Sequence, residues 1–270
     1  MLASILASWL AASFVAAREV LDSPRGGLAE TPARLGMAYR DVSFKTADGL
    51  TLRGLWIPGT EHRTIVMVHG LGSDREEPLN KAGYLHAAGY NLLVFDLRGR
   101  GQSDGSGTTM GYREPEDVRS AVAEARTLDP GPIALFGYSL GAAVAIEEAA
   151  VNPYVSAVVE DSGFSSAGDV FMARFRTITH LPDAWAAPLI AFGEMDIGTS
   201  LWNIRPVAMA TRLHKPLLAI VGGADTVVPP AEGLAIFDAA PGPKELLEIP
   251  TAAHVQAYYV ANQMYERTVL

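Results

Sequence analysis

The sequence predicts an α/β protein with a mostly parallel sheet and helices on both of its faces. Two observations predict this class. Short, continuously apolar runs recur along the chain from residue 64 onward, and stretches of helical character separate most of them. Strands that alternate with helices are joined by right-handed crossovers, which lay the strands parallel in one sheet. The carboxyl ends of such strands share an edge, and there we expect the chemistry to lie.

The first predicted strands form a hairpin. Residues 41–46 and 50–58 alternate apolar and polar side chains on either side of Asp48-Gly49, a pair typical of a tight turn. The runs at 64–70 and 91–96 are apolar throughout, as expected of strands that are buried on both faces.

The later elements follow in alternation. Glu114-Pro115-Glu116-Asp117 opens a helix to about residue 128, because proline fits a first turn and carboxylates stabilise its positive end. The other expected strands are 132–137, 155–161, 216–223 and 244–250, and the other expected helices lie near 78–88, 140–150, 231–239 and 254–267.

Composition excludes several classes of protein. The chain has 270 residues, of which 49% are hydrophobic and 19% charged, so it can bury a core and is not a disordered chain. The net charge is −9 and no block of basic residues is present, which argues against a nucleic-acid partner. The chain has 0 cysteines, which excludes disulfides, thiolate metal sites and a cysteine nucleophile.

The N-terminal segment carries no charge from residue 2 to residue 17. Three interpretations stay open: a signal peptide, a short membrane-associated helix, or a helix that packs on the protein or on a second copy of it. We divide the chain into an apolar helix with its linker at 1–36 and a main domain at 37–270. Cytoplasmic, membrane-associated and exported locations all stay open.

A candidate nucleophile lies in the sequence Gly137-Tyr138-Ser139-Leu140-Gly141, between a predicted strand and a predicted helix. This G-x-S-x-G pattern is typical of a sharp turn that exposes the serine hydroxyl at a helix N-terminus. The alternative is a structural turn whose serine only caps the helix.

A serine needs a base, and the base needs a carboxylate. His254 follows the last predicted strand and Asp225 follows the one before it, so both belong to the same edge of the sheet as Ser139. Their chain order of serine, aspartate and histidine matches the hydrolase arrangement. Asp161, which also ends a strand, is the second candidate for the acid. For the oxyanion we expect the backbone N–H groups of Leu140 and Leu71.

Together these motifs resemble the alpha/beta-hydrolase superfamily, in its serine esterase and lipase branch, over roughly residues 39–268. The segments that carry the resemblance are His69-Gly70-Leu71-Gly72, residues 96–103, Gly137 to Gly141, Gly222 to Asp225 with Val228-Pro229, and Ala253-His254. The resemblance implies an eight-stranded sheet, no cofactor or metal, and acyl transfer to water through an acyl-serine. Residues 96–103 then form a structural loop. The glycine often found before the family's histidine is absent here.

The interruption at 162–215 corresponds to the family's cap over the nucleophile. Its aromatic side chains favour an apolar acyl pocket, for which Phe164, Phe171 and Trp202 are the candidate substrate-binding residues. They suit the core of the cap equally well. A cap of this size is small, so we expect short to medium acyl chains.

The sequence therefore predicts a serine carboxylic-ester hydrolase that acts on a small-molecule ester. Its activity should rise with pH, with an apparent pKa near that of histidine, about 6.5. Thioesterase, amidase or peptidase activity on the same residues stays open, as does a non-catalytic ligand-binding relative. Membrane association or homodimerisation through residues 2–17 is compatible with each of these.

Overall fold

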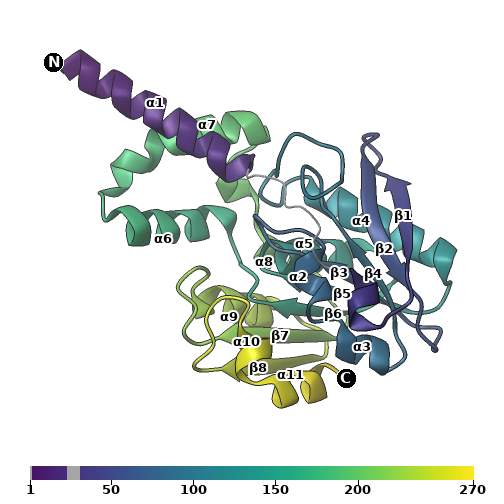
Figure 1. Cartoon of the computed structure of the whole chain (residues 1–270). Coiled ribbons are helices and arrows are strands. Elements are labelled where there is room, and N and C mark those ends of the chain that lie inside the picture. Colours follow the sequence, from purple (N-terminus) through teal and green to yellow (C-terminus); the bar gives the residue numbers. More distant parts are fainter. Residues whose placement is uncertain (1, 23–30) are drawn as a thin grey trace.

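The computed structural model describes residues 2–22 and 31–270, and its described part has the predicted α/β architecture (Figure 1). One sheet of eight strands runs in the order β1-β2-β4-β3-β5-β6-β7-β8. The pairs β1–β2 and β2–β4 are antiparallel, and all other neighbours are parallel. The strands are β1 (Arg40–Lys45), β2 (Thr51–Ile57), β3 (Thr64–Val68), β4 (Asn91–Phe95), β5 (Ile133–Tyr138), β6 (Val155–Asp161), β7 (Leu217–Gly222) and β8 (Lys244–Ile249).

Helices precede, connect and follow the strands. They are α1 (Leu2–Leu21), α2 (Glu76–Leu79), α3 (Gly83–Ala87), α4 (Glu114–Leu128), α5 (Leu140–Val151), α6 (Ala167–Thr179), α7 (Ala187–Ile197), α8 (Pro206–Ala210), α9 (Pro230–Ala239), α10 (Ala257–Val260) and α11 (Asn262–Val269). Short 3₁₀ turns lie at η1 (Pro32–Leu35), η2 (Asp183–Ala186) and η3 (Leu201–Asn203). The helices expected near 78–88 and 254–267 are each divided in two. The first division leaves the Lys81 side chain buried, and its ammonium group contacts Val255 and the ring of Tyr138.

The core lies on both faces of the sheet. Successive side chains of a strand point to opposite faces, so Val66 and Val68 of β3 join a cluster with α4 and α5. Ile65 and Met67 join the cluster on the other face, with α3 and α11. Each of these side chains is nearly or fully buried, and full burial of one contributes about 1.5–3 kcal/mol.

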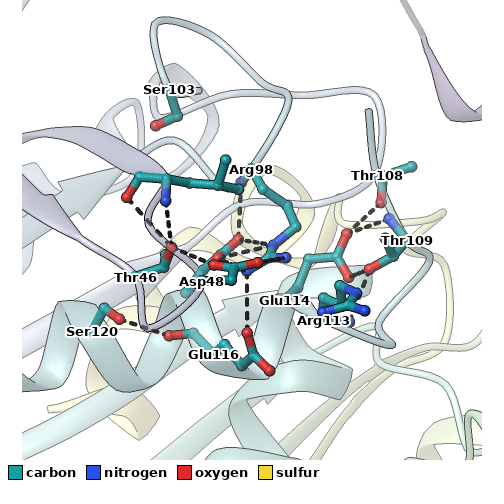
Figure 2. A network of polar contacts seen from close by, with 12 residues as sticks. Thr46, Asp48, Arg98, Ser103, Thr108, Thr109, Arg113, Glu114, Glu116 and Ser120 are labelled. Carbon is teal, nitrogen blue, oxygen red and sulfur yellow. Dashed lines mark hydrogen bonds and ion pairs between the residues drawn. The ribbon is translucent and has the colours of Figure 1, made fainter. Parts of the chain in front are cut away.

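Ion pairs of the buried Arg98 side chain and hydrogen bonds of Glu114 hold the loop after β4 in place (Figure 2). The Arg98 guanidinium donates to Asp117 of α4 at 2.7 Å and to Asp48 of the β1–β2 turn at 2.9 Å. The Glu114 carboxylate accepts hydrogen bonds from backbone and hydroxyl groups of residues 108–111. Burial raises the pKa of Asp117 to about 6, and Arg98 opposes that rise. These contacts join three segments that lie far apart in the sequence.

The N-terminal helix α1 runs along α7 of the cap, and its first residues lie at the end farthest from the sheet (Figure 1). The Trp9 ring meets that of Trp185 edge to face, with the ring centres 5.3 Å apart. Nearer the body of the protein, Arg18 forms an ion pair with Asp196 at 2.8 Å. In the described residues, no helix is both long enough and apolar enough to cross a bilayer. Residues 23–30, which belong to the expected linker, lie outside the described residues.

Candidate active site

Ser139 occupies a strained turn between β5 and α5, with φ 53° and ψ −117°. A non-glycine residue in this region stores about 1–3 kcal/mol, which its surroundings must hold. The residues two positions before and two positions after Ser139 have to be glycines. A Cβ at Gly137 would lie 2.2 Å from the carbonyl oxygen of Gly141, and one at Gly141 would lie 2.2 Å from that of Val68. The Ser139 N–H donates to the carbonyl of Asp161 at 2.9 Å, which fixes the turn to β6.

Three side chains from separate loops meet in one line of hydrogen bonds. The distance from His254 Nε2 to Ser139 Oγ is 2.9 Å, and that from His254 Nδ1 to Asp225 Oδ2 is 2.6 Å. Because a carboxylate only accepts, Nδ1 carries the proton and Nε2 is left to accept from the serine hydroxyl. The side chain of Asp225 is 2% exposed and that of His254 is 19% exposed. The imidazole is therefore placed where it can accept the hydroxyl proton, and the carboxylate where it can orient the imidazole.

The loops that carry the acid and the base pack directly on each other. Asp225 Oδ1 accepts the N–H groups of Val227 and Val228, at 2.8 and 2.9 Å. The Ala224 N–H donates to the carbonyl of Ala252 at 3.0 Å. No glycine precedes His254, and the positive φ at this turn belongs to the following residue, Val255.

Asp161, the second candidate for the acid, points elsewhere. Its carboxylate accepts hydrogen bonds from Ser162 at 2.9 Å and from Tyr265 at 2.8 Å. Among the described residues, the carboxylate bonded to His254 is that of Asp225.

The two expected oxyanion donors border Ser139. Leu140 is the first residue of α5, and Leu71 lines the same cavity as Ser139. Within the described residues, neither N–H is bonded to a protein acceptor. The N–H of Gly70, in contrast, donates to the Glu77 carboxylate at 2.6 Å.

His69 shapes the turn that carries these groups. Its Nε2 accepts the Leu97 N–H at 3.0 Å, so the proton lies on Nδ1, which donates to the Gly70 carbonyl at 2.8 Å. Burial lowers the pKa of His69 and keeps the ring neutral. These two hydrogen bonds give His69 a structural role in the turn.

A cavity of about 500 Å³ opens beside Ser139 and His254. Its walls are mostly polar, with Asp74, Glu77, Asn80, Lys81 and Gln256 among them. Sequence reasoning missed these residues, although most belong to the segment directly after β3. Their position after the carboxyl end of a central strand is the sequence signal that could have identified them. In the described part of the chain, no three histidine or carboxylate side chains are grouped as metal ligands would be.

The three candidate substrate-binding aromatics lie away from this cavity. Phe164 is 6% exposed and packs in the core. Phe171 lines a small apolar cavity between α1 and α7, and Trp202 lines a cleft on the cap. None of the three lines the cavity at Ser139. The reason is that α7 packs on α1 and α6 packs on η2 and η3, so aromatic side chains of the cap lie in these contacts. Trp202 of η3, for example, packs on Gly168 of α6.

Comparisons with known proteins agree with this fold. The model of the alpha/beta hydrolase family matches residues 65–261. An uncharacterized protein of Mycobacterium tuberculosis is 31% identical over 243 residues, which are 88% of this chain and 80% of that protein. The protein YqkD of Bacillus subtilis, also uncharacterized, is 27% identical over 83% of this chain and 75% of its own length. The solved structure of the Pyrococcus furiosus esterase Pf2001 has a TM-score of 0.79 at 27% identity, and covers 93% of this chain and 96% of that one.

Proposed function

We propose that this chain, which belongs to the alpha/beta hydrolase family, is a serine hydrolase that cleaves carboxylic esters. The observation that carries the proposal is the line of hydrogen bonds from Asp225 through His254 to Ser139. The esterase of Pyrococcus furiosus, with its similar structure, supports the choice of ester substrates.

The reaction proceeds in two halves. Ser139 Oγ attacks the acyl carbon while His254 Nε2 takes its proton, and the carbonyl oxygen becomes an oxyanion. The N–H groups of Leu71 and Leu140 stabilise that oxyanion, and one such donor contributes about 3–4 kcal/mol. His254 then gives the proton to the leaving alcohol, which leaves an acyl group on Ser139. Water, deprotonated by His254, attacks the acyl-serine, and the acid departs as the hydroxyl regains its proton.

The cavity limits the substrate. Its volume of about 500 Å³ suits a small ester, and its polar walls favour an alcohol part or an acyl part that forms hydrogen bonds. We therefore propose short to medium acyl chains. The cap aromatics do not enter this proposal as acyl-binding residues.

A panel of p-nitrophenyl esters tests the function. Acetyl, butyryl, octanoyl and palmitoyl esters, with a thioester and an anilide of the best acyl group, are given to the wild type and to Ser139→Ala. We expect hydrolysis of acetyl or butyryl esters, and a loss of roughly 10⁴-fold or more in the variant. A palmitoyl optimum would reject the proposed chain length. Faster cleavage of the thioester or anilide than of the matched ester would move the proposal to thioesterase or amidase activity.

A further inference from the structure

A second buried carboxylate lies beneath the proposed catalytic centre and has no part in the reaction above. Asp161 ends β6 and is fully buried. Its Oδ1 accepts from the Ser162 hydroxyl at 2.9 Å, and its Oδ2 accepts from the Tyr265 hydroxyl at 2.8 Å. Its backbone carbonyl accepts the N–H of Ser139 at 2.9 Å. One residue therefore contacts the nucleophile turn by its backbone, and the adjacent Ser162 and the last helix by its side chain.

Ser162 connects the Asp161 carboxylate to the turn that carries His254. A hydroxyl has one proton, and Ser162 donates it to Asp161 because a carboxylate only accepts. The oxygen of Ser162 is then free to accept the N–H of Val255, at 3.1 Å. Val255 directly follows His254. The Asp161 carboxylate therefore orients the Ser162 hydroxyl, and that hydroxyl binds the backbone next to His254.

The backbone along this path is strained. The φ angles of Ser139, Ser162 and Val255 are 53°, 60° and 58°, in the left-handed region. Positive φ is rare for residues other than glycine and is a marked outlier for a β-branched residue such as valine. Such conformations persist only where the surroundings hold them, and they gather at functional sites. Hydrogen bonds at Ser139, Ser162 and Val255 provide that hold here.

Lys81 holds the same turn from its other side. Its ammonium group donates to the Val255 carbonyl at 3.4 Å and lies 4.0 Å from the centre of the Tyr138 ring. Burial lowers the pKa of Lys81, and the charge of Asp161 opposes that change. Burial likewise raises the pKa of Asp161, against the opposing effects of Lys81, of its two hydrogen-bond donors and of His254. Glu160, the residue before it, is also buried.

We propose that Asp161 is a positioning residue of this centre, which acts through Ser162 to hold the His254–Val255 turn in the conformation that aims the imidazole at Ser139. This role rests on the proposed serine hydrolase function. It also accounts for a carboxylate at the end of β6 that is not the partner of the base.

The test compares Ser162→Ala with Tyr265→Phe. Both remove one hydrogen bond to the same carboxylate, but only the first releases the Val255 N–H. For each variant we would measure kcat and KM on p-nitrophenyl acetate, the rate of labelling by a fluorophosphonate probe between pH 5 and pH 9, and the melting temperature. We expect Ser162→Ala to lower kcat and the labelling rate about 10- to 100-fold with little change in KM, because the base is misplaced. Tyr265→Phe should lower the melting temperature and keep a labelling rate close to that of the wild type.

Asp161 itself gives the second arm. Asp161→Asn keeps an acceptor for Ser162 and should retain more of kcat than Asp161→Ala does.

Three results would overturn the proposal. If folded Ser162→Ala is labelled at the wild-type rate and with the wild-type pH profile, the positioning role is wrong and the proposed hydrolase function is unaffected. If Ser162→Ala does not fold, a folded Asp161→Ala with wild-type kcat and labelling rate has the same consequence. A wild type that the probe does not label on Ser139 removes both proposals together.

Discussion

Glu160 gives a prediction about stability that does not depend on the reaction. Its side chain is fully buried, Oε2 accepts the Gly163 N–H at 2.9 Å, and Oε1 has no hydrogen-bond partner among the described residues. Burial raises its pKa from 4.5 to about 8. The folded protein therefore keeps the carboxyl proton over a pH range in which the unfolded chain has lost it.

The sign and size of the effect follow from proton linkage. Between pH 4.5 and pH 8 the folded state binds the extra proton, so this group's contribution to stability is present below pH 4.5 and is lost as the pH rises to about 8. From pH 5 to pH 9, Glu160 should remove about 4 kcal/mol from the free energy of unfolding. Glu160→Gln keeps an acceptor for Gly163 and does not ionise, so the variant should gain that amount relative to the wild type.

Urea unfolding at pH 5, 7 and 9 measures this difference. Other buried carboxyl groups change the absolute stability of both proteins alike and cancel in the comparison. Glu248→Gln, at an exposed position of β8, is the matched control and should follow the wild type. If the free energy of unfolding changes with pH in the same way for Glu160→Gln and the wild type, the prediction is wrong. That result would mean that Glu160 is ionised in the folded protein at pH 7.

Three further predictions concern other parts of the molecule. Gly141→Ala should prevent stable folding or lower the melting temperature sharply, because its Cβ would lie 2.2 Å from a carbonyl oxygen of β3; a soluble variant with the wild-type melting temperature would contradict this. Asp225→Asn should reduce kcat about 10⁴-fold with the fold intact, as its amide no longer holds His254 in the required tautomer. Retention of most of the activity would count against the acid assignment. Phe14→Ala removes an edge-to-face contact with Phe192 of α7 at 5.4 Å and should make α1 easier to cleave by protease than in the wild type; equal cleavage rates would show that the contact does not hold α1.

Much of the fold was readable because its signals are local. The apolar runs of β3, β4 and β5 are continuous, and the glycines at 137 and 141 mark a turn that no other residue fits. The meeting of Ser139, Asp225 and His254 followed from topology, since each lies after the carboxyl end of a parallel strand.

The remaining features depend on contacts between distant segments. The divided helix at 76–87 leaves Lys81 buried against Val255, which is 174 residues away in the chain. The aromatics of the cap suit a pocket and a packed interior equally well. Contacts with other segments, such as that of Phe192 with Phe14 of α1, decide where they lie. The contacts of Asp161 are also hidden in the sequence, because its partner Tyr265 comes from the last helix.

The central claim is that His254 makes the hydroxyl of Ser139 nucleophilic. Labelling with a fluorophosphonate, followed by mass spectrometry of the modified peptide, tests it directly when the wild type is compared with His254→Ala. We expect an adduct on Ser139 in the wild type and a labelling rate lower by roughly 10³-fold or more in His254→Ala. An adduct that forms equally fast without the imidazole, or no adduct on Ser139, would contradict it.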